Sequence, residues 1–323
     1  MKRVVLTGAS GFIGANLARR LLEDGHEVHL LVRPGYARWR LEAIHADLHI
    51  HEIHLGNEES VAHGVSLSRP DWVFHLAAHG AYSSQTDVRR MIQTNILGTV
   101  NLVEASLKVG FEAFVNTGSS SEYGGKDHAP CETEWLEPNS SYAVSKACAT
   151  QFCRYMAQSR HVHIPTLRLY SVYGPYEEPT RLMPTLIIRG LNGELPPLVN
   201  AEISRDFVYM KDVEEAYILA ASRPNQEPGA IYNVGTGLCT PMHEMVEMVR
   251  RVMGIAVEPQ WGSMPDRQWD TKVWVSDNRK IKDTLGWKPH YTVEQGFRRM
   301  VAWLRENPAL LRWYQERLDR IDR

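Results

Sequence analysis

The chain has 323 residues, of which 43% are hydrophobic and 23% are charged, as is ordinary for a soluble globular protein. Its 36 Lys and Arg residues against 38 Asp and Glu residues leave a formal net charge of −2, too small for long-range attraction to nucleic acid or anionic lipid. No apolar run approaches the roughly 18 residues of a membrane-spanning helix, and residues 1–3 are not followed by the hydrophobic region of a secretory signal. We therefore expect a cytoplasmic protein that contacts neither nucleic acid nor membrane.

Short apolar segments alternate with helix-compatible stretches through the first half of the chain. The segments predicted to be strands are 3–6, 27–32, 50–54, 72–75, 113–116 and 164–169. Strands that are apolar almost throughout and separated by helices are typical of a parallel sheet covered on both faces. We predict an α/β fold with a Rossmann-like, doubly wound parallel sheet.

From about residue 170 the alternation stops, and five prolines crowd residues 175–197. Because proline interrupts regular structure, a smaller C-terminal α/β lobe is predicted to begin here. The predicted boundaries are 1–170 for the sheet domain and 171–323 for the lobe. Two later apolar segments, 207–209 and 231–234, are predicted to return to the main sheet as short strands.

Glycines recur every three residues between the first predicted strand and the helix that follows it. This spacing permits a tight turn, a close approach of the backbone to a pyrophosphate, and tight packing of helix on strand, while the helix N-terminus supplies N–H donors. The turn favours a dinucleotide cofactor, although a glycine-rich turn that merely packs would have the same pattern. The expected cofactor contacts here are Gly8, Ser10, Gly11, Phe12, Ile13 and Gly14.

The end of the second predicted strand indicates which dinucleotide is bound. A carboxylate there binds the ribose 2′-OH of NAD(H), whereas an arginine accepts the 2′-phosphate of NADP(H). Arg33 stands at this position, and Arg38 or Arg40 could assist it. The pattern favours NADP(H) and leaves NAD(H) possible, because Arg33 could also be a solvated charge at the end of a strand.

Histidines cluster around the third predicted strand: His45, His49, His51 and His54. They have no evident carboxylate or cysteine partner, so we interpret them as exposed strand residues rather than metal ligands. The four cysteines form neither a C-x-x-C pair nor a metal-finger spacing. We therefore expect neither a disulfide nor a bound metal.

Tyr142 and Lys146 stand four residues apart near the start of a predicted helix, so both project from one face. A phenol has a pKa of about 10, and a neighbouring ammonium lowers that value by stabilising the phenolate. Such a pair can move a proton, although Tyr-x-x-x-Lys is also common on helix surfaces. A serine run at 119–121 follows the fifth predicted strand, where the carboxyl end of a parallel sheet places ligands.

With these residues the chain resembles the extended short-chain dehydrogenase/reductase family of nucleotide-sugar epimerases, dehydratases and 4-ketoreductases. The resemblance covers nearly the whole length. It rests on the glycine turn, His75-Leu76-Ala77-Ala78, Thr94-Asn95, the serine run before Tyr123-Gly124, Tyr142-x-x-x-Lys146, and the segments at 167–175, 205–209, 232–235 and 285–287.

The resemblance implies a role for each matching residue. Tyr142 would be the general acid/base, Lys146 would tune it and hold the nicotinamide ribose, and Ser119 would hydrogen-bond the reacting oxygen of the sugar. Further cofactor contacts would be Asn57, Leu76, Ala77, Ala78 and Asn95. The substrate contacts would be Ser119, Ser120, Ser121, Arg205 and Arg267, the two arginines binding the diphosphate; ion pairs with Asp206 or Asp270 are the alternative for these arginines.

One departure from the family pattern guides the expected reaction. Members that dehydrate the sugar carry a glutamate base two residues after the serine, whereas this chain has Ser121 there and Glu122 one step later. We therefore expect a 4-ketoreductase in which NADPH reduces a 4-keto-6-deoxy sugar nucleotide. The alternatives are a 4-epimerase with tightly bound NAD and a non-catalytic dinucleotide-sensing protein.

The resemblance also implies a homodimer. Helical patterns at 87–107 and 142–160 correspond to helices that pair across a dimer as a four-helix bundle in this family. Burial of both helices within one subunit is the alternative.

Overall fold

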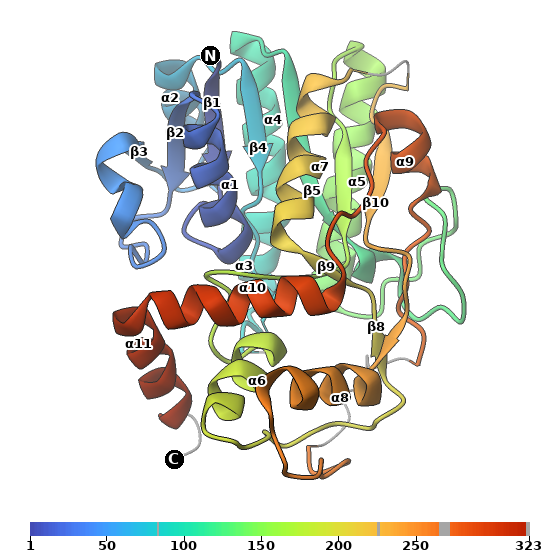
Figure 1. The fold of residues 1–323 in the computed structure, drawn as a ribbon. Helices are drawn as coiled ribbons and strands as arrows, with labels where there is room; N and C mark the ends of the chain where they lie inside the picture. The colour runs from blue at the N-terminus through green and yellow to red at the C-terminus, as the bar shows by residue number, and fades with distance from the viewer. Residues whose placement is uncertain (83, 225–226, 265–271, 321–323) are drawn as a thin grey trace.

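The computed structural model describes residues 1–82, 84–224, 227–264 and 272–320. Its centre is a seven-stranded sheet in which all neighbouring strands run parallel (Figure 1). In spatial order the strands are β10 (Ile231–Val234), β6 (Thr166–Leu169), β5 (Ala113–Ser119), β4 (Trp72–His75), β1 (Arg3–Thr7), β2 (Glu27–Val32) and β3 (His49–Glu52). This order is that of the doubly wound dinucleotide-binding fold, so the predicted fold class is confirmed.

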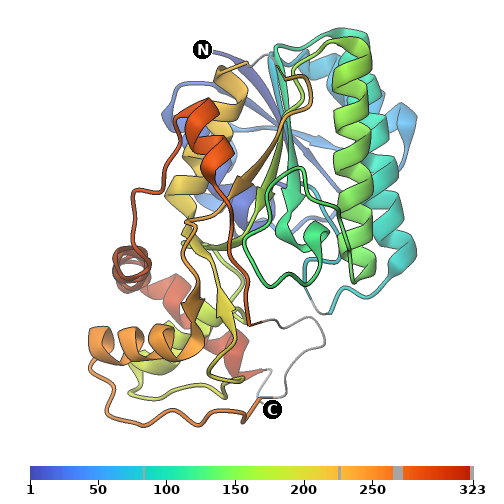
Figure 2. The ribbon, with the colours of Figure 1, turned by 90° about the vertical axis from the view of Figure 1, so that its right-hand side faces the viewer.

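The strands are apolar because helices cover both faces of the sheet. Along β1, Val4 and Leu6 enter one core while Val5 enters the other, as the alternation of side chains in a strand requires. The Val5 face is covered by α2 (Glu58–Ser68), α4 (Gly98–Val109) and α5 (Ser141–Arg160). The opposite face is covered by α1 (Phe12–Glu23), α7 (Met210–Ser222) and α9 (Arg279–Leu285). Figure 2 shows α4 and α5 on one side of the sheet and α7 and α9 on the other.

A second core forms the smaller lobe below the sheet in Figure 1. Its helices are α6 (Leu182–Leu191), α8 (Met242–Met253), α10 (Val293–Glu306) and α11 (Pro308–Asp319). Two small sheets accompany them, β7 (Ser171–Tyr173) with β9 (Phe207–Tyr209) and β8 (Ser204–Arg205) with β11 (Thr240–Pro241). The remaining short elements are η1 (Glu42–Asp47), α3 (Val88–Met91), the π-helical η2 (Ile92–Leu97) and η3 (Ser120–Tyr123).

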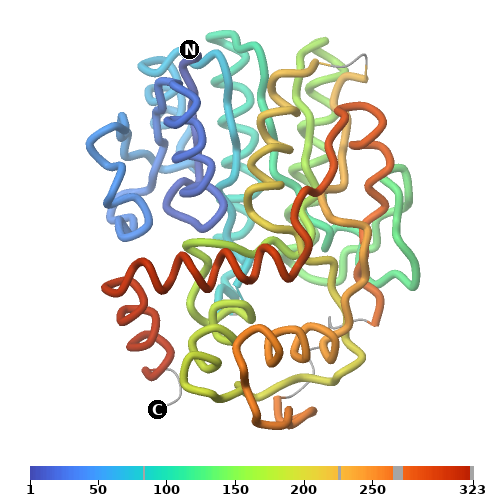
Figure 3. The backbone as a smooth tube through the Cα atoms, in the orientation of Figure 1, coloured from blue at the N-terminus to red at the C-terminus, as the bar shows by residue number. Residues whose placement is uncertain are grey.

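The backbone passes repeatedly between the sheet domain and the lobe, as the tube in Figure 3 shows. After α6 the chain returns to the sheet domain with α7 and β10, enters the lobe with α8, packs α9 on the sheet domain, and ends in the lobe with α10 and α11. Segments after residue 170 therefore contribute to both parts. Within the described residues, no helix combines the length and apolar character needed to cross a bilayer.

Of the two strands predicted to return to the main sheet, 231–234 does so as β10, beside β6. The prediction for 207–209 is wrong, because this segment pairs in parallel with β7. The reason is that β10 occupies the outer edge of β6, which leaves no free edge there. Strand β9 pairs instead with β7, which is separated from β6 by the single residue Tyr170.

Candidate active site

The carboxyl ends of the strands face the lobe, because β1 begins at the end of the sheet away from it (Figure 1). Strand β1 is flanked by β2, the next strand in the chain, on one side and by β4 on the other. The direction in which strands are added to the sheet therefore reverses at β1. Ligands of open α/β sheets bind outside the carboxyl ends of strands where the order reverses in this way. A dinucleotide is therefore expected outside the carboxyl ends of β1 and β4, the position that is called the crevice in such folds.

The glycine turn at this crevice fits a dinucleotide. Gly8 has φ +73°, and a Cβ there would lie 2.6 Å from backbone atoms of Leu76 and Ala77. A Cβ on Gly14 would lie 2.4 Å from the Gly8 carbonyl oxygen. Gly11 is the N-cap residue of helix α1 and has no side chain that could cap the helix. The backbone N–H groups of the first turn are therefore available to bind an anion. The backbone is thus packed too closely around Gly8 and Gly14 for any side chain. The N–H groups at the start of α1 are the hydrogen-bond donors expected beside a pyrophosphate.

A buried histidine joins the ends of β1 and β4. The His75 ring forms hydrogen bonds with Thr7 Oγ1 at 2.8 Å and with Thr99 Oγ1 at 2.9 Å. Thr7 Oγ1 also accepts from the backbone N–H groups of Leu76 and Ala77, both at 3.2 Å. Burial lowers the pKa of His75 to about 3, so the ring is neutral and serves to position the strand ends. Ala78, like Leu76 and Ala77, is half-buried along this edge.

Two predicted cofactor contacts are engaged with the protein itself. Asn95 is 1% exposed. Its Oδ1 accepts from the His79 N–H, and its Nδ2 donates to the His79 carbonyl and to Ser145 Oγ, all at 2.8 Å. Ser145 Oγ in turn donates to the Tyr142 carbonyl, so Asn95 ties the crevice loop to the start of α5. The exposed Asn57 caps α2 by accepting from the Ser60 N–H at 2.7 Å.

The arginines expected near the ribose differ in their surroundings. Arg33 is exposed directly after β2, where it is able to meet a ligand. Arg40 is 6% exposed and donates to the carbonyls of Tyr176 and Ser10 and to the Glu178 carboxylate. The Arg40 guanidinium therefore already holds the loop after β7 against the glycine turn, and its assistance in phosphate binding stays a prediction.

The proposed catalytic residues lie where β5 ends and α5 begins. Ser119 is the last residue of β5, while Tyr142 and Lys146 lie in the first two turns of α5, which the Ser140 side chain caps. Burial raises the pKa of Tyr142 to about 12, and a hydrogen bond with Ser119 opposes this rise. The net direction is opposite to the lowering expected from Lys146, because loss of solvent outweighs the other effects. Lys146 is 3% exposed, and burial lowers its pKa.

Glu122 is buried directly behind Ser119 and forms an ion pair. Its Oε2 accepts from Arg168 Nε at 2.9 Å, and the two side chains are 0% and 1% exposed. Its Oε1 accepts from the Ser119 N–H at 2.8 Å and from Thr150 Oγ1 at 2.9 Å. Both carboxylate oxygens are therefore engaged in holding the end of β5 against β6 and α5.

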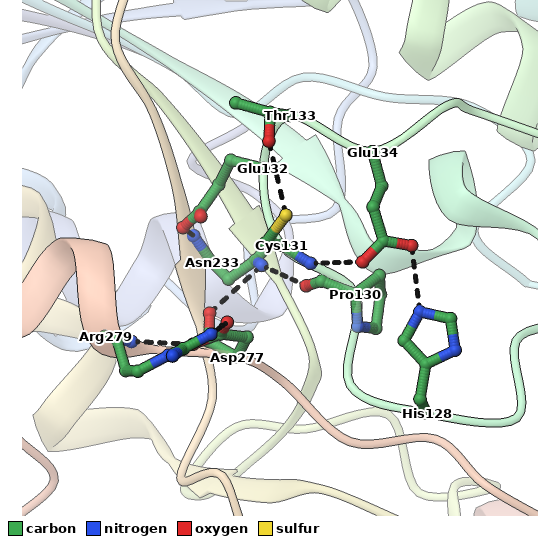
Figure 4. Close-up of polar contacts among 9 residues, drawn as sticks. All are labelled: His128, Pro130, Cys131, Glu132, Thr133, Glu134, Asn233, Asp277 and Arg279. Atoms are coloured by element: carbon green, nitrogen blue, oxygen red, sulfur yellow. Dashed lines mark hydrogen bonds and ion pairs between the residues drawn. The ribbon is translucent and has the colours of Figure 1, made fainter.

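The loop after η3 is fastened to β10 by a second network, drawn in Figure 4. The Asn233 N–H donates to Glu132 Oε1 at 2.9 Å, and the Asn233 amide donates to the carbonyls of Pro130 and Asp277. Asn233 also accepts from the Tyr123 hydroxyl at 2.8 Å. These positioning residues were missed from the sequence, because only the pairing of β10 with β6 brings them together.

The predicted substrate residues lie on the lobe side of Ser119. Ser121 Oγ is 2.7 Å from Ser119 Oγ, and Ser120 Oγ accepts from Trp274 Nε1 at 3.1 Å. The Arg205 guanidinium lies 5.6 Å from the centre of the Trp274 ring, so the structure brings Arg205 near the serine run. Arg267 lies outside the described residues.

Asp206, next to Arg205, is buried and fully engaged. It accepts hydrogen bonds from backbone and hydroxyl groups of Thr236 and Ser276 and from the Gly237 N–H. This carboxylate fastens the segment after β10 to β8 and β9. No sequence pattern signalled its role.

A glycine-rich turn after β1, together with Ser, Tyr and Lys residues beside the end of β5, is the arrangement typical of oxidoreductases of the short-chain type. In agreement, residues 4–235 match the family described as NAD dependent epimerase/dehydratase family. The chain belongs to this family, whose enzymes act on nucleotide sugars. The resemblance seen in the sequence motifs is confirmed.

Individual relatives span nearly the whole chain. A dTDP-glucose 4,6-dehydratase of Xanthomonas campestris is 29% identical over 345 residues, covering 98% of this chain and 95% of that protein. The UDP-glucose 4-epimerase of Thermus thermophilus, solved in complex with NAD, is 30% identical with a TM-score of 0.82, covering 93% of this chain and 98% of that one. The UDP-glucose 4-epimerase of Thermotoga maritima, solved with UDP-glucose, has a TM-score of 0.85 at 28% identity and covers 94% and 98%.

Proposed function

We propose that the protein is an NAD-dependent 4-epimerase of a nucleoside-diphosphate hexose. Its named relatives perform two chemistries, epimerisation and 4,6-dehydration. The observation that favours epimerisation is the engagement of Glu122. Dehydration needs a carboxylate base beside the sugar, but Ser121 stands at the expected position, and Glu122 is buried in its ion pair with Arg168.

The proposed roles follow from the geometry at the end of β5. When bound, NAD supplies the hydride acceptor and donor that inversion at C4 requires. Tyr142 would take the proton from the C4 hydroxyl and return it, while the Ser119 hydroxyl orients the same oxygen. Burial keeps the Tyr142 phenol protonated, so its activation depends on the positive charge of Lys146, one helical turn away.

The 4-ketoreductase interpretation depended on Arg33 and on the missing dehydratase carboxylate. An epimerase lacks that carboxylate as well, so its absence does not favour reduction. Solved relatives, among them the UDP-glucose 4-epimerase of Thermus thermophilus, hold NAD, which does not support an NADP(H) preference. Arg33 is exposed, and a solvated side chain there is compatible with NAD. We therefore propose NAD(H) as the cofactor.

The test is to incubate the purified protein with UDP-glucose or dTDP-glucose, without any added reductant, and to identify the products by NMR. Formation of the C4 epimer is expected, with NAD released when the protein is denatured. Tyr142→Phe should lower the rate by about 10²–10⁴-fold, because it removes the acid/base group. Tyr155→Phe is the control for removing a phenol hydroxyl from the same helix, since Tyr155 is 63% exposed; its mass in solution is compared with that of the unaltered protein, because Tyr155 lies on the surface proposed below to pair with a second copy.

Other products would contradict the proposal in distinct ways. A 4-keto-6-deoxy sugar formed from the glucose nucleotide would show dehydration. Turnover only of 4-keto sugars, with consumption of NADPH, would support the ketoreductase. Absence of turnover on a panel of nucleotide sugars would support the dinucleotide-sensing alternative.

The homodimer is also a proposal. Helices α4 and α5 pack on the sheet from within the subunit, and α5 in addition exposes Val144 at 46% and Tyr155 at 63%. An outward apolar surface on this helix is what pairing with a second copy would cover. Light scattering after size-exclusion chromatography should give twice the mass of 36.8 kDa, whereas a monomer mass would contradict the proposal.

A further inference from the structure

Polar side chains from β2 and β3 meet at the amino-terminal ends of these strands. His29 of β2 lies directly across from His49 of the edge strand β3, and Leu31 lies across from His51. Because alternate residues of a strand share a face, Glu27 and His29 project on the same side as His49 and His51. The sheet therefore assembles three imidazoles and a carboxylate from two segments more than 15 residues apart in sequence.

The atoms of three of these side chains lie close enough to share one ion. Glu27 Oε1 is 2.9 Å from His29 Nε2 and 3.9 Å from His49 Nε2, and the three donor atoms all lie within 4.8 Å of one another. Tetrahedral zinc with bonds near 2.05 Å separates its ligand atoms by about 3.3 Å. Small side-chain movements would bring these donors to that spacing.

We propose that Glu27, His29 and His49 bind a zinc ion, with water in the fourth position and His51 orienting the His29 ring. His51 Nε2 lies 3.0 Å from His29 Nδ1. In the zinc-bound form His29 Nδ1–H donates to His51, which leaves the Nε2 lone pair of His29 for the metal. Such a partner on the second ring nitrogen is the usual support of a histidine ligand.

The chemistry of the donors selects the class of ion. Two imidazoles with one carboxylate suit zinc and similar transition metals, whereas magnesium and calcium prefer oxygen ligands alone.

Binding requires one local movement. The His29 and His49 rings are stacked, with centroids 4.6 Å apart and planes inclined by 18°, whereas a metal lies in the plane of each ligating ring. The side chain of His49 is 58% exposed and is free to rotate toward the ion. His29 is 7% exposed and stays in place between Glu27 and His51.

The ion would join the edge strand to its neighbour and would not take part in the reaction. Glu27 begins β2 and Val32 ends it, so at about 3.3 Å per residue the two ends are ~17 Å apart. Arg33 and the dinucleotide crevice lie beyond Val32. The expected effect of zinc is therefore stabilisation of the β2–β3 edge.

Untagged protein should be freed of metal with a chelator and titrated with zinc chloride by calorimetry, with bound zinc counted by atomic emission. We expect one zinc per chain and a higher Tm in its presence. Cobalt(II) in place of zinc should give the strong visible absorption of a tetrahedral nitrogen and oxygen site. His49→Ala and Glu27→Gln should each weaken binding by at least about tenfold.

His54→Ala is the matched control, because His54 is an exposed histidine in the same region that lies outside the cluster. Its affinity for zinc should equal that of the unaltered protein. The proposal is overturned if the unaltered protein binds no stoichiometric zinc, if His49→Ala and Glu27→Gln bind as tightly as the unaltered protein, or if His54→Ala loses as much affinity as they do.

Discussion

The buried ion pair between Glu122 and Arg168 gives a quantitative test of the site. Glu122→Gln keeps an oxygen for the Ser119 N–H and for Thr150 but places an NH₂ group against the Arg168 N–H. Removing one charge of a fully buried pair costs about 3–5 kcal/mol, because the partner remains charged without solvent. The pair is 0% and 1% exposed, so we expect the full loss in the free energy of unfolding.

The measurement is urea unfolding followed by circular dichroism, with the midpoint and the slope fitted separately. A lower midpoint at an unchanged slope would report lost stability alone. The double variant Glu122→Gln with Arg168→Met is the control, because removing both charges leaves no unpaired cation. It should recover part of the stability that Glu122→Gln loses.

A small effect would refute this reasoning. If Glu122→Gln changes the free energy of unfolding by less than about 1 kcal/mol, the carboxylate is not a buried structural charge. If the same variant also abolishes elimination of water from a nucleotide sugar, Glu122 is the catalytic base of a dehydratase. That result would overturn the proposed epimerase as well.

Three further changes test other parts of the molecule. Gly14→Ala should weaken NAD binding by at least tenfold in a fluorescence titration, because its Cβ would lie 2.4 Å from the Gly8 oxygen; unchanged affinity would show that the turn does not cradle the cofactor. Arg33→Ala should leave NAD affinity within about twofold and weaken NADP alone, whereas a large loss of NAD affinity would contradict a solvated Arg33. Burial raises the pKa of Glu177 from 4.5 to about 8, so the folded state holds a proton that the unfolded state releases, and stability falls as pH rises between these values. Glu177→Gln should therefore stabilise the protein more at pH 8 than at pH 5 in urea unfolding, and equal gains would contradict this sign.

The strands of the sheet centre could be predicted because both of their faces are buried. The unbroken apolar runs Val4–Leu6 of β1 and Trp72–Phe74 of β4 each place their side chains alternately in the two cores. The edge strand β3 was placed at 50–54 but spans His49–Glu52, because three of its four residues are His or Glu and give no apolar signal. The pairing of β9 depends on which strand occupies the edge of β6, a contact between distant segments that local pattern does not encode.

The candidate site divides in the same way between local and distant contacts. The glycine turn and the Tyr142–Lys146 pair each occupy fewer than ten consecutive residues, so spacing alone indicates their chemistry. The expectation of no metal depended on the lack of a fixed carboxylate or cysteine partner for His49 and His51 in the sequence. The register of β2 against β3 supplies one, because it sets His29 across from His49 and thereby brings Glu27 within reach. A ligand set divided between neighbouring strands becomes visible only once their register is known.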